Sequence, residues 1–197
     1  MVTPGSAPGR RERKKAATRK ALADAALELF LERGYEKVTI AQIAEAADTA
    51  TTTLFAHYPA GKEALILDDS GERETSLIEA VRNRSDGTSA LDALHTFFAG
   101  RAPFADDRDL PERYRRASKL VMDTPALWAY ARQVWVACQD PLARLLAEAA
   151  GQSEPDDSLH LLASYVLETP GHAAGRPDRR AALDEAFRRL RLAWPEL

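Results

Sequence analysis

The polar residues with the clearest chemical use in this chain are three consecutive threonines, Thr51, Thr52 and Thr53, followed by His57. A threonine hydroxyl both donates and accepts hydrogen bonds, and its methyl group can contact the methyl group of a thymine base. His57 lies one helical turn beyond Thr53, so both side chains can reach phosphate. A run of threonines can also do no more than cap a helix, and a lone histidine is often structural. In this pattern, contacts with nucleic acid are the favoured interpretation.

Three further residues flank this run at positions suited to a DNA backbone. Thr39 precedes apolar residues at helical spacing, so it can cap a helix whose dipole attracts a phosphate. Lys62 offers a positive charge and is a second phosphate candidate. The hydroxyl of Tyr58 is a third candidate for a DNA contact, although its ring is expected to form an apolar core face with Leu54 and Phe55.

Three helical segments are predicted to position these residues. The first carries apolar residues at helical spacing over residues 18–33 and ends at Gly34, a natural stop for a helix. The second covers residues 40–46 and the third residues 50–57, with a tight connection between them. Two short helices joined in this way are typical of a helix-turn-helix, whose second helix enters the major groove of DNA. We therefore predict a helix-turn-helix at residues 39–58.

Several short motifs stand at fixed distances from one another along this region. They are Leu29-Phe30, Gly34-Tyr35, Thr39, Ile43-Ala44, the run Leu54-Phe55-Ala56-His57-Tyr58, and Lys62-Glu63. With them, the stretch from residue 18 to residue 67 resembles the DNA-binding domain of the TetR (tetracycline-repressor-like) family of transcriptional regulators. The resemblance implies that Thr51 and Thr52 sit where base contacts are common, and it leaves Thr53 for a phosphate.

The turn of the predicted helix-turn-helix departs from the family pattern. Asp48 stands where the family has glycine, and aspartate tolerates the left-handed backbone of such a turn better than most residues. Ala50 replaces the usual serine cap, so Thr49 or Thr51 is expected to cap the third helix. The turn is therefore expected to form with different residues.

The predicted recognition helix also has an unusual surface. Phe55 replaces a tyrosine, which removes a hydroxyl that could bond a phosphate, and residues 59–61 make the link to Lys62 one residue longer. The helix carries no Arg, Asn or Gln, the side chains that form paired hydrogen bonds to one base. Specificity is therefore expected to rest on DNA shape and van der Waals contacts.

The whole chain is predicted to be all-α, with about nine helices and no convincing strand. We divide it into a flexible basic arm at residues 1–15, a helix-turn-helix DNA-binding domain at 16–62, and a ligand-binding and dimerisation domain at 63–197. The arm is either a solvated tail or a segment that touches DNA. Its basic residues are Arg10, Arg11, Arg13, Lys14 and Lys15.

Proline, glycine and capping residues divide the last domain into helices. They are expected over residues 61–82 with a bend at Ser70-Gly71, 89–98, 111–123, 125–150 with a distortion near Pro141, 156–168 and 177–193.

Charge is distributed unevenly along the chain. Residues 1–62 hold ten Lys and Arg against seven Asp and Glu, whereas the remainder holds seventeen against twenty-three. A basic N-terminal part joined to an acidic remainder suggests that the first part meets a polyanion and the second does not.

Composition also excludes several classes of protein. Cys138 is the only cysteine and the four histidines are scattered, so no disulfide, metal site or cofactor is expected. No nucleophile is paired with a base, so the chain is not predicted to be an enzyme. No apolar run approaches the ~18 residues that span a bilayer, and the N-terminus lacks the apolar core of a signal peptide. We predict a cytoplasmic protein that joins the nucleoid when it is bound to DNA.

Aromatic and sulfur-containing residues gather between residues 97 and 138. Most are expected to form a core, but the TetR resemblance implies an inducer pocket among these helices. We expect that pocket to be lined by Phe98, Met122, Trp128 and Trp135. Three cations on the 111–123 helix, Arg115, Arg116 and Lys119, either meet an acidic ligand or form a solvated face. Residues 114–151 resemble mycofactocin-regulator-like members of the family, which hints at acyl or acyl-CoA ligands.

The last two predicted helices carry apolar stripes that either close the domain or face a partner. The TetR resemblance implies a homodimer through these two helices, which would place two recognition helices on successive half-sites. The chain is therefore predicted to be a ligand-responsive, sequence-specific repressor that a small hydrophobic or acyl-type effector releases from operator DNA. The alternatives are a helical DNA-binding protein with little sequence specificity and an enzyme or ligand carrier with an incidental helix-turn-helix.

Overall fold

A computed structural model describes residues 9–67 and 71–197, apart from the side chain of Asp107. The chain divides into two compact units, residues 1–68 and 69–197. The described ranges form eleven α-helices and two short 3-10 turns, and contain no strand. The prediction of an all-α fold is confirmed. The helices outnumber the predicted nine because two of the expected long helices are each divided in two.

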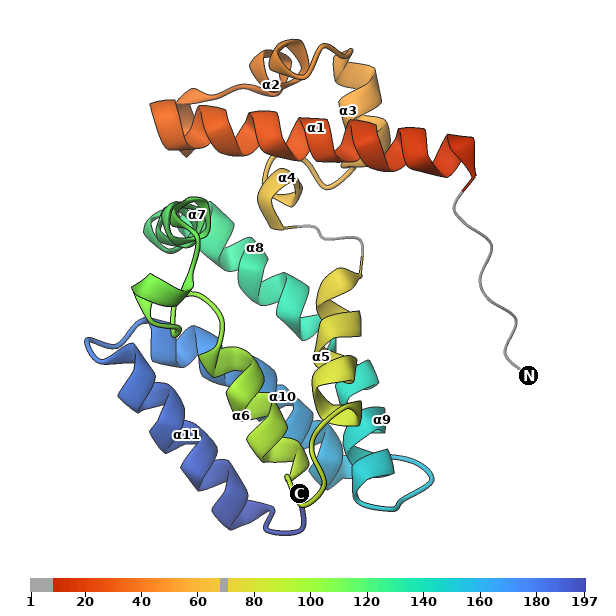
Figure 1. Ribbon diagram of the computed structural model, residues 1–197, viewed down its shortest axis with the longest axis vertical. Helices are drawn as coiled ribbons and strands as arrows, with labels where there is room; N and C mark the ends of the chain where they lie inside the picture. The colour runs from red at the N-terminus through yellow and green to blue at the C-terminus, as the bar shows by residue number, and fades with distance from the viewer. Residues whose placement is uncertain (1–8, 68–70) are drawn as a thin grey trace. The chain divides into compact units, whose positions relative to one another are not determined.

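The first unit is built on one long helix. Its four helices are α1 (Arg10–Arg33), α2 (Ile40–Ala46), α3 (Thr51–His57) and α4 (Ala64–Leu67), and α1 contacts α2 and α4 (Figure 1). The buried side of α1 carries Leu22, Ala26, Leu29 and Phe30, which recur at the three- and four-residue spacing of one helical face. Gly34 ends α1 with a φ of 84°, and its N–H donates to the carbonyl of Phe30.

The basic residues at the start of α1 correct one prediction. The helix begins at Arg10, eight residues before the predicted start, so residues 10–15 are helical and exposed. The expected flexible arm at residues 1–15 is therefore wrong for this part, and residues 1–8 of the arm lie outside the described residues. Arginine and lysine have good helix propensity, so a charged segment can extend a helix that is nucleated by the apolar turns after it.

The second unit contains the remaining seven helices. They are α5 (Glu72–Arg82), α6 (Ala90–Ala99), α7 (Glu112–Asp123), α8 (Pro125–Val136), α9 (Gln139–Ala149), α10 (Asp157–Ala174) and α11 (Arg179–Ala193). In Figure 1, α6, α10 and α11 run side by side, and α10 also contacts α9. The chain end returns to the start of α6, where the N–H of Leu91 donates to the carbonyl of Leu197 at 2.9 Å.

The apolar stripes of α10 and α11 close this unit. Nearly all of their members are buried, namely Leu159, Leu162, Ala163, Val166 and Leu167 on α10 and Leu183, Phe187 and Leu190 on α11, whereas Leu192 is exposed. The stripes were expected either to close the domain or to face a partner, and their buried residues close the domain. The core continues through α6 and α9, where Leu94 and Leu146 are fully buried.

Two helix boundaries differ from the prediction because of where proline stands in a helix. The segment 125–150 breaks at Ala137 and Cys138 rather than at Pro141, because Pro141 lies in the first turn of α9, where an N–H has no partner in the helix. In contrast, α10 continues through Pro170 to Ala174, six residues past the predicted end. Burial of Pro170 and Ala174 on the same face offsets the hydrogen bond that the proline cannot make.

The segment 61–82 is also divided. Helix α4 is only four residues long, and α5 begins after Gly71, whose φ of 90° is a left-handed conformation that favours glycine. The predicted bend at Ser70-Gly71 thus falls where α5 starts, with Ser70 itself outside the described residues. No helix within the described ranges is both long and apolar enough to span a membrane.

Candidate DNA-binding site

The helix-turn-helix is present at the predicted residues. Thr39 caps α2 through a capping box, in which its hydroxyl accepts from the Gln42 N–H at 3.3 Å and the Gln42 side chain accepts from the Thr39 N–H at 2.9 Å. Asp48 adopts a φ of 49° in the turn, the left-handed conformation that was expected of it. The Thr49 N–H then donates to the carbonyl of Ala44 at 2.9 Å and closes the turn.

The start of α3 corrects a prediction about its cap. The capping position is Ala50, and no side chain forms a capping hydrogen bond there. Thr51 is already the first residue of the helix, so neither Thr49 nor Thr51 acts as the cap. The Thr51 and Thr52 side chains are exposed, and Thr53 is half-buried. Because the hydroxyl of Thr51 is not used for capping, it is available on the outer face of the helix.

Phe55 was predicted to be part of the core and lies instead on the outer face of α3. Its side chain is 49% exposed, whereas Leu54 and Tyr58 are buried. Leu54 and Tyr58 are four residues apart and share the inner face, and Phe55 is about 100° further around the helix. The exposed residues of α3 are therefore Thr51, Thr52, Phe55 and Ala56, a mixture of hydroxyls, methyl groups and one aromatic ring.

Tyr58 ties α3 to α1, and the predicted DNA contact of its hydroxyl stays a prediction. It is buried, and its hydroxyl donates to the carbonyl of Arg19 at 3.0 Å. The Arg19 guanidinium lies 4.2 Å from the centre of the Tyr58 ring and donates to the carbonyl of His57 at 2.6 Å. This pair fixes the C-terminal end of the recognition helix. The contact joins residues far apart in the chain, so no local sequence signal pointed to Arg19.

Lys62 also contacts the scaffold, and its predicted phosphate contact stays a prediction. Its ammonium donates to the carbonyls of Tyr35 at 2.7 Å and Val38 at 3.0 Å, and lies 3.9 Å from the centre of the Tyr35 ring. These contacts use two of its three N–H groups on the loop between α1 and α2. Lys62 thereby fixes the approach to α2.

The neighbouring Tyr35 hydroxyl donates to the carboxylate of Glu63. Burial raises the pKa of Tyr35, and the hydrogen bond to Glu63 and its negative charge raise it further. The phenol therefore stays protonated and remains a donor at neutral pH. Together with Lys62, it connects the residues just before α4 to the loop after α1.

His57 keeps one ring nitrogen available for DNA. The ring is half-buried, and its Nδ1 atom is buried with no hydrogen-bond partner in the part of the chain that the structure describes. The ring can therefore meet a phosphate only through Nε2. Thr39 is exposed at the start of α2, where its hydroxyl also donates to Gln42 Oε1 at 3.2 Å.

Positive charge in this unit is concentrated at the start of α1. Residues 10–20 hold seven Lys and Arg and one Glu, and the five cations between Arg10 and Lys15 are exposed. The acidic residues Asp24, Glu28 and Glu32 lie further along the same helix. The first three turns of α1 therefore present the positive surface that a nucleic acid backbone requires.

Sequence comparisons agree with this geometry. The model of the tetR family of bacterial regulatory proteins matches residues 22–68. The HTH-type transcriptional regulator TcmR of Streptomyces glaucescens is 31% identical over 173 residues, which cover 86% of this chain and 76% of TcmR. This protein belongs to the TetR family. It is thus a DNA-binding transcriptional regulator, and the matched relatives are regulators rather than enzymes.

Two other comparisons extend over most of the chain. MftR of Mycobacterium tuberculosis (strain ATCC 25618 / H37Rv), whose name assigns it to mycofactocin biosynthesis regulation, is 27% identical over 144 residues. These residues cover 73% of this chain and 71% of MftR. The solved structure of Thermus thermophilus FadR in complex with lauroyl-CoA shares the fold, with a TM-score of 0.53 and 24% identity. That match covers 87% of this TetR-family chain and 92% of FadR.

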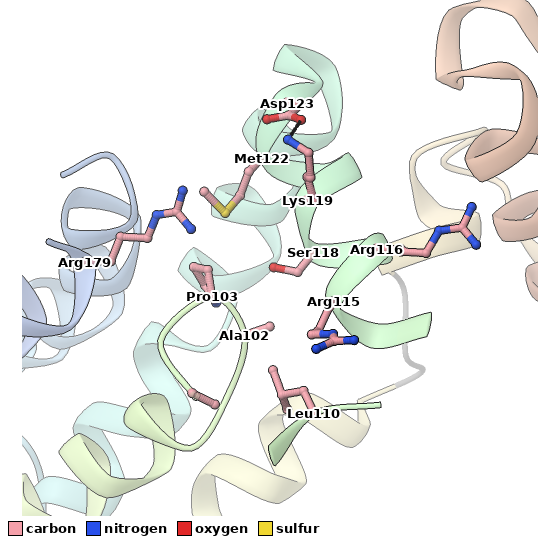
Figure 2. A pocket seen from close by; sticks show the side chains of 11 residues that line it. Ala102, Pro103, Leu110, Arg115, Arg116, Ser118, Lys119, Met122, Asp123 and Arg179 are labelled. Atoms are coloured by element: carbon pink, nitrogen blue, oxygen red, sulfur yellow. Dashed lines mark hydrogen bonds and ion pairs between the residues drawn. The ribbon is translucent and has the colours of Figure 1, made fainter. Parts of the chain in front are cut away.

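The second unit of this TetR-family regulator contains a hollow of about 290 Å³ beside α7 (Figure 2). Of the four residues predicted to bind an effector, Met122 lines it. Phe98 is buried in the core, with its ring centre 5.2 Å from that of Trp135 and 6.2 Å from that of Phe187. Trp128 and Trp135 are partly buried and pack against the same core. These three aromatic residues therefore serve mainly to build the unit.

Proposed function

We propose that this regulator is a repressor that binds operator DNA as a homodimer and is released by a small hydrophobic or acyl-type effector. The observation that carries the proposal is the outer face of α3. Thr51, Thr52 and Phe55 are exposed there, while Leu54 and Tyr58 hold the opposite face in the unit. A recognition helix needs this combination of a rigid inner face and an accessible outer face.

Each predicted DNA contact that remains accessible has a defined role in this proposal. Thr51 and Thr52 contact base edges and thymine methyl groups, and the exposed ring of Phe55 adds apolar contact. Thr53 and His57 approach the phosphate backbone of one DNA strand. Thr39 approaches phosphate at the start of α2.

Phosphate contacts contribute affinity without reading the sequence. The cations in the first turns of α1 serve the same purpose. Because α3 carries no Arg, Asn or Gln that could make paired hydrogen bonds to a single base, operator preference is expected to depend on DNA shape as well as on contacts with bases.

The homodimer is proposed to form through the outer faces of α10 and α11. Leu161 and Tyr165 on α10 are each 48% exposed, and Leu192 on α11 is 70% exposed. Trp194 lies beside them, with its ring centre 6.2 Å from that of Tyr165 and its indole N–H donating to Ser158 at 2.9 Å. Exposed apolar groups on neighbouring helices are typical of a surface that a partner covers.

The effector class rests on two comparisons. FadR was solved with lauroyl-CoA, and the resemblance to MftR extends into the second unit. An effector that binds the DNA-released state more tightly than the DNA-bound state shifts the regulator from its operator.

The proposal is tested by selecting duplexes from a random pool with the full-length protein and then measuring competition binding. We expect recovery of a two-fold symmetric sequence whose half-site centres lie about one helical turn, ~34 Å, or a multiple of it apart. The selected duplex should compete far better than random duplex. Equal competition would favour the alternative of a DNA-binding protein with little sequence specificity, and a monomer in light scattering at micromolar concentration would contradict the dimer.

A further inference from the structure

The hollow beside α7 is unusual for the charge of the residues that form it. Its lining comes from the loop after α6, from α7 and from the first residue of α11. Four cations and one carboxylate contribute to it, namely Arg115, Arg116, Lys119, Arg179 and Asp123. Residues 115–119 are separated by about sixty positions from Arg179, so the fold brings these charges together.

The ion pairs around the hollow involve two of its four cations. Lys119 is paired with Asp123 at 2.7 Å, which accounts for the single carboxylate of the lining. Arg115 is paired at 3.1 Å with Glu112, which lies outside the lining, and Arg115 takes part in a further interaction as well. Arg179 forms no hydrogen bond or ion pair within the described ranges, and the neighbouring carboxylate of Asp178 caps α11 instead, accepting from the Ala181 N–H.

The direction of the side chains distinguishes the cations of the lining (Figure 2). The guanidinium of Arg179 is directed toward Met122, and Arg115 lies between Ser118 and Leu110. Arg116 points away from the hollow. Arg179 is therefore the group that an anion in the hollow would meet.

The remaining walls suit the apolar part of a small organic ligand. Pro103, Leu110 and Met122 supply carbon and sulfur surface, and the Ser118 hydroxyl faces the same space (Figure 2). A volume of about 290 Å³ is at the low end of the range for small-molecule pockets, ~300–1,000 Å³. A whole coenzyme A ester would leave most of its atoms outside, whereas a short-chain acid or ester phosphate fits this size.

We infer that this hollow binds a small organic anion, with its carboxylate or phosphate group at Arg179 and its apolar part against Met122 and Leu110. A guanidinium binds either anionic group through paired, charge-assisted hydrogen bonds. This inference rests on the proposed function in one respect, since it makes the anion the effector, or part of the effector, that the second unit senses.

The test is calorimetric titration of the full-length protein with three ligands that share one chain length: octanoate, octyl phosphate and 1-octanol. The anions should bind at least about tenfold more tightly than the alcohol, because the charge-assisted hydrogen bonds are lost with the alcohol. The stronger of the two anions identifies whether carboxylate or phosphate is preferred. Equal binding of all three ligands would overturn the inference.

Arg179→Gln is the variant that locates the site. It should weaken binding of both anions about tenfold and leave 1-octanol unchanged. The matched control is Arg144→Gln, because Arg144 is exposed on α9 and is not part of the lining. Anion binding that is equal in the two variants would place the anion elsewhere and overturn the inference. Thermal unfolding of both variants checks that they are folded.

Operator release is measured separately with the same ligands, so that the two proposals can fail independently. Anion binding that depends on Arg179 but leaves operator affinity unchanged would support the anion site and contradict release by this ligand. Operator release by 1-octanol with no anion preference would support release by a hydrophobic effector and overturn the anion site.

Discussion

The two units of this regulator use charged and apolar residues in opposite ways. In the first unit, Arg19 and Lys62 bind backbone carbonyls and hold the scaffold, while the outer face of α3 carries uncharged Thr51, Thr52 and Phe55. In the second unit, the aromatic residues build the core, and the cations line the hollow. Residue type alone therefore does not identify a contact with ligand or DNA. Position relative to the core decides it.

The largest expected effect comes from Lys62→Ala, which tests whether a cation of the first unit stabilises its scaffold. The variant removes two charge-assisted hydrogen bonds to carbonyls, so the free energy of unfolding should fall by about 2–3 kcal/mol. Urea unfolding measures this change. Lys37→Ala is the matched control, since Lys37 is exposed in the same loop, and it should change stability by less than about 0.5 kcal/mol.

The salt dependence of DNA binding separates the two possible roles of Lys62. As a scaffold residue, it should leave the slope of affinity against salt unchanged when it is replaced. A slope reduced by about one, together with unchanged stability, would show that Lys62 contacts a phosphate after all.

A smaller effect is expected from Tyr58→Phe, which removes only the hydroxyl that donates to Arg19. The free energy of unfolding should fall by about 1 kcal/mol, because one buried hydrogen bond is lost and the ring is kept. Binding to all duplexes should keep its affinity, measured by fluorescence anisotropy. Weaker binding to all duplexes with unchanged stability would return Tyr58 to the DNA surface and weaken the division between the two units.

The sequence predicted the local features of the fold better than its long-range contacts. The Thr39 cap and the turn at Asp48 each depend on residues within three or four positions, and each is confirmed. The roles of Lys62 and Tyr58 depend on carbonyls more than twenty residues away. No spacing rule within a helix identifies such partners.

The same reason explains why two phenylalanines differ in burial. Phe55 and Phe98 have the same side chain, yet Phe55 is half-exposed and Phe98 is buried. The difference arises from the side of its helix on which each residue lies. Leu54 and Tyr58 turn the opposite side of α3 toward the core, whereas Phe98 lies on the side of α6 that packs against Phe187 of α11. Met122 and the three cations of α7 were expected near a ligand, but the part that Arg179 plays in the hollow could not be predicted, because Arg179 reaches it only through the tertiary fold.

Thr52→Ala tests whether the outer face of α3 contacts bases. Thr52 is exposed and its side chain forms no hydrogen bond within the described ranges, so the free energy of unfolding should change by less than about 0.5 kcal/mol. The preference for the selected operator over random duplex should fall about fivefold, as expected for one lost contact of about 1 kcal/mol. Thr53→Ala is the control, because a phosphate contact should weaken both duplexes alike. An equal loss on both duplexes for Thr52→Ala would refute base contact there.

The smallest effect, Phe55→Tyr, sharpens the comparison at the residue where the outer face of α3 is most apolar. Phe55 is exposed, so a hydroxyl on its ring requires no burial and should leave stability unchanged within about 0.5 kcal/mol. The new hydroxyl can donate to a phosphate, and affinity should rise about threefold on operator and random duplex alike. Fluorescence anisotropy on both duplexes measures the change. A gain restricted to the operator would mean that the ring contacts bases, which would make Phe55 a residue that reads sequence rather than one that only supports the backbone contact.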